Sequence, residues 1–72
     1  MVCYFLNARR VVSKKDKVFF IMQVADLTGV VSELFVSEDI FAITSTLCPF
    51  DRIVLNISLS SGRINVESIE KN

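Results

Sequence analysis

Histidine is absent from this 72-residue chain, and glycine, cysteine and proline are scarce. Histidine is the commonest general base and metal ligand, so its absence excludes a Ser-His-Asp or Cys-His catalytic set. Two glycines are too few for a glycine-rich loop that cradles a phosphate. Two cysteines make no disulfide framework, and they do not form the Cys-x-x-Cys pair typical of a zinc site. We therefore expect a protein that is not an enzyme and that uses no metal ion or cofactor.

Long apolar runs are absent as well. No stretch approaches the ~20 apolar residues of a membrane-spanning helix, and the opening residues lack the basic start of a signal peptide. We therefore expect a cytoplasmic protein without a membrane partner. The hydrophobic fraction is 51%, which is generous for one domain near the lower size limit. This apolar excess favours self-association, and we predict a homodimer.

The charged residues balance in number but not in position. Eight basic and eight acidic residues give a formal net charge of zero. Basic residues gather near the start of the chain, at Arg9, Arg10, Lys14, Lys15 and Lys17. The segment 18–50 has no lysine or arginine, and its acidic residues are Asp26, Glu33, Glu38 and Asp39. This asymmetry predicts a basic end that attracts phosphate, although a solvated turn would have the same composition.

The spacing of apolar residues predicts five β-strands and one short helix. The predicted strands are Val2–Val12, Val18–Ala25, Val30–Val36, Arg52–Ser60 and Arg63–Ile69. Ser37 followed by two acidic residues is typical of a helix N-terminus, and Pro49 ends the helix. In the last two strands, the alternation predicts that Ile57, Leu59 and Ile64 face inward, onto the core.

Three strands, a short helix and a two-stranded hairpin are the element order of the OB-fold, a five-stranded Greek-key barrel. We predict a single all-β domain of this class over residues 1–72, with the helix between strands three and four. The absence of an internal repeat or a linker agrees with one domain.

The segment Lys17–Gly29 resembles the second strand and following turn of nucleic-acid-binding OB-folds, ending in an Asp-x-x-Gly turn. Similar segments occur in the anticodon-binding domains of class II tRNA synthetases and in the OB domain of bacterial replicative DNA polymerase. Leu47–Val54 is similar to the family's entry to strand four, with Phe50 where the family often has glycine. The resemblance covers residues 9–69, nearly the whole chain.

The small size is similar to that of the minimal single-stranded DNA-binding proteins of phages and mobile elements, which are OB domains that dimerise. The resemblance therefore implies binding of single-stranded DNA or RNA, with DNA and a role in DNA replication favoured. In such folds the ligand crosses strands two and three, between the loops after strands one and four. The nucleic-acid-binding residues implied in this way are Arg9, Lys14, Lys15, Lys17, Phe19, Ile21, Gln23, Phe35 and Arg63. Rings would stack on bases and cations would hold phosphates, with little sequence preference.

The two faces of the strand Val18–Ala25 leave an alternative open. Phe20 and Met22 lie on one face and Phe19 on the other, because side chains alternate along a strand. A register shift of one residue would bury Phe19 in the core, and a dimer would bury it against a second chain. Glu33 falls among the candidate residues and would repel phosphate. The competing interpretation is a protein-interaction or oligomerisation module of OB type that binds no nucleic acid.

Overall fold

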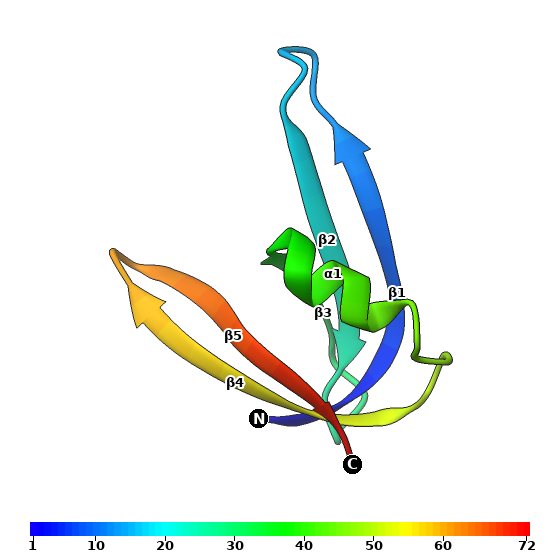
Figure 1. Ribbon diagram of the computed structural model, residues 1–72. Coiled ribbons are helices and arrows are strands. Elements are labelled where there is room, and N and C mark those ends of the chain that lie inside the picture. The colour runs from blue at the N-terminus through cyan, green and yellow to red at the C-terminus, as the bar shows by residue number, and fades with distance from the viewer.

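The computed structural model describes residues 1–72 and contains five β-strands and one α-helix (Figure 1). The elements are β1 (Val2–Val12), β2 (Val18–Ala25), β3 (Val31–Val36), α1 (Glu38–Thr44), β4 (Arg52–Ser60) and β5 (Arg63–Lys71). All five strands pair antiparallel in one sheet, in the order β3-β2-β1-β4-β5. The predicted all-β class with one short helix after the third strand is confirmed. The sheet has two edges, β3 and β5, so its hydrogen bonds do not close it into a barrel.

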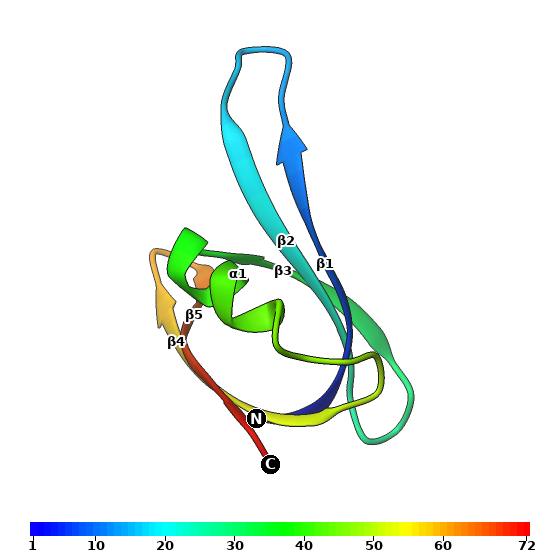
Figure 2. The same ribbon diagram turned by 45° about the vertical axis from the view of Figure 1, so that its right-hand side comes forward.

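The sheet is curved, and its two hairpins diverge. β1 and β2 rise as a long arm, while β4 and β5 lean away from it (Figure 1). In the view turned by 45°, the sheet is strongly curved, and α1 lies on the inner side of the curve (Figure 2). The ladder between β2 and β3 ends at Phe20 and Val36, so the arm beyond Phe20 is only two strands wide. Both chain termini lie at the end opposite the tip of the arm (Figure 1).

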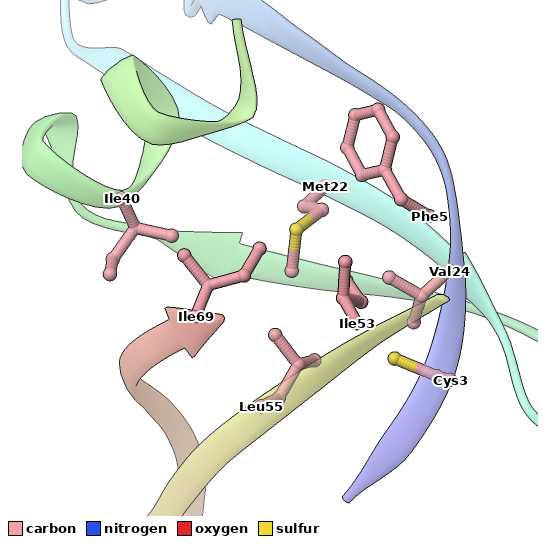
Figure 3. Close-up of a cluster of buried hydrophobic side chains, with 8 residues drawn as sticks. All are labelled: Cys3, Phe5, Met22, Val24, Ile40, Ile53, Leu55 and Ile69. Atoms are coloured by element: carbon pink, nitrogen blue, oxygen red, sulfur yellow. The ribbon is translucent and has the colours of Figure 1, made fainter. Parts of the chain in front are cut away.

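The core lies inside the curve of the sheet and is closed by α1. It is one cluster of eight buried apolar side chains, shown in Figure 3: Cys3, Phe5, Met22, Val24, Ile40, Ile53, Leu55 and Ile69. Met22 and Val24 have no exposed surface, so β2 turns this face inward and the Phe19 face outward. Burying one such side chain contributes about 1.5–3 kcal/mol, so a core of this size gives a small domain modest stability.

Local signals set the start of α1. The hydroxyl of Ser37 accepts a hydrogen bond from the backbone N–H of Ile40 (3.3 Å), and two acidic residues follow at the positive end of the helix dipole. Ile40 joins the core, and the ring of Phe41 packs on that of Phe20 with centroids 4.6 Å apart. The helix has seven residues, so the chain contains no helix with the length and hydrophobicity of a membrane span.

The hairpin of β4 and β5 extends past the core. Along the inward face of β4, Leu55 is buried, but Ile57 is 38% exposed and Leu59 is 78% exposed. Leu59 pairs with Ile64 across the hairpin, and Ile64 is exposed too. The inward direction of these side chains follows the predicted alternation, but their predicted contact with the core is wrong because no layer covers the hairpin tip.

Candidate nucleic-acid interface

Alternate residues of β1, β2 and β3 form the outer face of the sheet, opposite the core. The strand register aligns them in rows. One row is Asn7, Gln23 and Glu33; the next is Arg9, Ile21 and Phe35; the last is Val11 and Phe19. Met22, between two of these rows, is buried on the other side, so the side chains of all three rows leave the sheet outward. Five predicted site residues, from β1, β2 and β3, therefore share one face.

Phe19 and Phe35 form an aromatic pair on this outer face. Their ring centroids are 6.0 Å apart and their planes make an angle of 65°, which is an edge-to-face arrangement. Phe35 is 66% exposed and Phe19 is 41% exposed, so neither ring belongs to the core. Such a pair contributes about 0.5–1.5 kcal/mol and holds the two rings at a fixed angle. Phe35 keeps the larger free surface.

Side-chain contacts across the strands organise the polar part of the outer face. Nη2 of Arg9 donates to Oε2 of Glu33 at 2.6 Å, across the intervening strand β2. Nδ2 of Asn7 donates to Oε1 of Gln23 at 2.7 Å. Arg9 and Glu33 are both half exposed, so the pair adds about 0–1 kcal/mol to stability. Its main effect is to cancel the negative charge of Glu33 beside the rings.

The three predicted lysines lie at the free end of the arm, in the turn between β1 and β2. Ser13 organises this turn, because its hydroxyl accepts hydrogen bonds from the backbone N–H groups of Lys15 (3.3 Å) and Lys17 (3.2 Å). Lys14, Lys15 and Lys17 are exposed and form no ion pair. Lys17 directly precedes β2, so its Cα lies about 7 Å along the strand from that of Phe19.

A cleft of about 730 Å³ lies beside the aromatic pair, between β3 and the start of β5. Phe19 and residues 33–35 line one side, and residues 62–65 line the other. Arg63 and Asn65 are exposed in this cleft, and the side chains of neither make a hydrogen bond or ion pair within the chain. The cleft brings together three of the predicted site residues, Arg63, Phe19 and Phe35. The lysines at the tip of the arm do not line it.

Two features of the site were not expected from the sequence. The first is the ion pair of Glu33 with Arg9, which changes Glu33 from a repulsive charge into a neutralised one. Arg9 is accordingly engaged within the protein and is not a free cation. The second is the cleft itself, with Leu34, Ile64 and Asn65 in its lining. The sequence contains a signal for the ion pair only, because the alternation along β3 places Glu33 on the same face as Phe35.

The site consists of exposed rings, amides and cations. No three His, Cys, Asp or Glu side chains of the protein lie close enough together to hold a metal ion. A scan against models of protein families, a search of curated proteins and a search of solved structures each gave no match to this chain.

Proposed function

We propose that this protein binds single-stranded nucleic acid, with DNA favoured, along the outer face of β1, β2 and β3. The observation that carries the proposal is the exposure of Phe35 and Phe19 on a face flanked by unpaired cations. Large exposed apolar groups mark an interaction surface, and rings beside cations match the bases and phosphates of a single strand. Little sequence preference is expected from stacking, because every base has a π-face.

The binding energy is divided between rings and cations. Stacking of one base on an aromatic ring contributes about 1–3 kcal/mol. Lys14, Lys15, Lys17 and Arg63 are free to contact phosphates, because none of them pairs with a carboxylate. Each phosphate contact releases counterions from the strand, so binding weakens as salt is added. The resulting complex is held by few contacts and depends strongly on salt.

We further propose that the open sheet is an OB-fold barrel whose last seam lies between β3 and β5. Residues 33–35 share one cleft with residues 62–65, and residues 35–37 share a second with residues 65–67. From the first cleft to the second, the residue numbers increase on both β3 and β5, so the two strands run alongside each other in the same direction. This arrangement supports a Greek-key barrel whose last seam has no backbone hydrogen bonds.

A salt series tests the proposed function. The fluorescence anisotropy of a labelled oligo-dT is measured with the protein from about 20 to 200 mM salt. With four phosphate contacts, the plot of log affinity against log salt has an expected slope of about −3. The absence of binding at the lowest salt would refute the proposal.

The exposed tip of β4 and β5 supports the second candidate, a protein-interaction module. Ile57, Leu59 and Ile64 form an apolar surface there, and the arm lysines lie on the other hairpin. This function would remain if the salt series showed no binding.

A further inference from the structure

The cleft between β3 and β5 has a feature that simple stacking does not use. One of the residues that line it is Glu33, an acidic residue beside the exposed ring of Phe35. Its carboxylate can accept a hydrogen bond, which stacking and phosphate binding do not need. We infer that the cleft seats one base of the bound strand and favours a base with an exocyclic amine, so that cytosine is preferred to thymine. This inference rests on the proposed nucleic-acid binding.

The seat for the base is formed by the rings and the apolar lining. Phe35 is the more exposed ring, and Phe19 meets it edge-to-face, so Phe19 supports the platform while Phe35 offers its free surface. Leu34 and Ile64 provide apolar lining from the two strands. The volume of about 730 Å³ lies within the range of small-molecule sites, about 300–1,000 Å³, so one base and its sugar fit.

Glu33 supplies the discrimination. Its Oε2 accepts from Arg9, and its Oε1 has no hydrogen-bond partner in the protein. An ionised carboxylate only accepts hydrogen bonds. Cytosine presents its N4 amine, a donor, where thymine presents its O4 carbonyl, an acceptor. Cytosine can therefore donate to Oε1, whereas thymine would bring two acceptors together.

Two further residues, Arg9 and Asn65, allow the cleft to prefer cytosine while it still binds the strand. Arg9 cancels the charge of Glu33, so the carboxylate accepts from a base without strongly repelling the neighbouring phosphates. Asn65 lines the cleft with an amide that both donates and accepts, so it can serve either pyrimidine. The preference thus depends on Glu33, and it adds one modest selective contact to otherwise unselective stacking.

The test compares two labelled oligonucleotides of equal length, oligo-dC and oligo-dT, at one low salt concentration and slightly alkaline pH. The two pyrimidines have rings of the same size and differ at the position that Glu33 would contact. One extra hydrogen bond predicts that oligo-dC binds roughly 3- to 10-fold tighter. Glu33→Gln should bring the ratio of the two affinities close to one, because an amide can also donate to O4.

Glu70→Gln is the matched control. It removes the same charge from an exposed position of β5 that pairs with Val54, outside the cleft, and should keep the preference for oligo-dC. Equal binding of both oligonucleotides by the unmodified protein would overturn the inference and leave the proposed function standing. A preference that survives Glu33→Gln would also overturn it. Binding of neither oligonucleotide would refute the proposed function and the inference with it.

Discussion

Three residues other than glycine have a positive φ: Asp16 at 58°, Phe50 at 72° and Ser61 at 52°. Asp16 and Ser61 are short and polar and lie in hairpin turns, where short polar residues adopt this conformation more readily than bulky ones. Phe50 is bulky, 75% exposed, and occupies the position at which the resembled family often has glycine. A left-handed backbone at a residue with a Cβ costs about 1–2 kcal/mol, so Phe50 is the most strained position of the chain.

Phe50→Gly is therefore expected to stabilise the protein. The gain from relieving the backbone exceeds the entropy cost of glycine by about 0.5–1 kcal/mol, and the exposed ring gives up little packing. Urea denaturation measures the change in unfolding free energy. Phe50→Ala is the control, because it removes the ring but keeps the Cβ, and it should give no gain. Equal stabilisation by both variants would show that backbone strain is not the cause.

The two rings of the candidate interface should differ in their effect on binding. Phe35→Leu keeps apolar bulk but removes the stacking surface, and should weaken oligo-dT binding about 5-fold or more. Phe19→Leu keeps a support beside Phe35, and should weaken binding less. Phe35 is mostly exposed, so thermal unfolding should show a loss of no more than about 1 kcal/mol. A large loss of stability in Phe35→Leu without a binding defect would contradict the assigned role of Phe35.

At the scale of elements, the arm carries the free cations. Lys14→Ala combined with Lys15→Ala removes two of the proposed phosphate contacts, and the salt slope should become shallower by about 1.4. The control is Arg52→Ala with Lys71→Ala, which removes two positive charges at the beginning of β4 and the end of β5. The beginning of β4 and the end of β5 lie near the chain termini, at the end of the molecule opposite the tip of the arm (Figure 1), and the control should leave the slope unchanged. If both double variants gave the same slope of log affinity against log salt, the arm would not be part of the interface.

The turn between α1 and β4 is tied to the end of β5 by Asp51. Its Oδ2 accepts from the backbone N–H of Cys48 (2.9 Å) and lies 3.4 Å from Nζ of Lys71. The hydrogen bond from Cys48, and then the charge of Lys71, lower the pKa of Asp51 below its ordinary value. A lowered pKa in the folded state means that this stabilisation is complete above the ordinary carboxyl pKa and is lost as the pH falls through the folded value.

Acid denaturation tests this role of Asp51. The unfolding free energy of the unmodified protein should fall as the pH drops below about 4, the ordinary pKa of an aspartate. Asp51→Asn keeps an oxygen that accepts from Cys48 but cannot titrate, so its stability should depend less on pH. The lowered pKa of Asp26, which accepts from Thr28 and Val30, leaves part of the pH dependence in place. An unchanged pH dependence in Asp51→Asn would contradict the proposed stabilisation.

For the whole molecule, the elements were readable from the sequence because their signals are local. Three of these signals act within a few residues and appear as predicted. They are the alternation of apolar residues along the strands, the helix cap at Ser37 and the turn Asp26–Gly29. The sequence could not predict whether the sheet closes into a barrel, because closure depends on how β3 and β5, which are distant in sequence, meet in space. The exposure of Leu59 had the same cause, since no local pattern tells how far a hairpin extends past its core.

The candidate site also has parts that the sequence predicts and parts that it does not. The sequence left the register of β2 open, and the structure exposes Phe19. The Arg9–Glu33 pair depends on cross-strand geometry that no single segment encodes.

The homodimer stays a prediction, favoured by the small core and the exposed apolar residues. Sedimentation equilibrium should give twice the 8.1 kDa of one chain, and a monomer at every concentration would contradict the prediction.

The central claim is that the outer face of β1, β2 and β3 binds a single strand. The most direct measurement is the backbone amide NMR spectrum of the ¹⁵N-labelled protein during a titration with oligo-dT at low salt. The predicted result is a continuous set of shifted signals over Phe19–Gln23, Phe35 and the Lys14–Lys17 turn, with α1 unaffected. Shifts confined to α1 or to the outer side of β4, or no shifts at all, would contradict the claim.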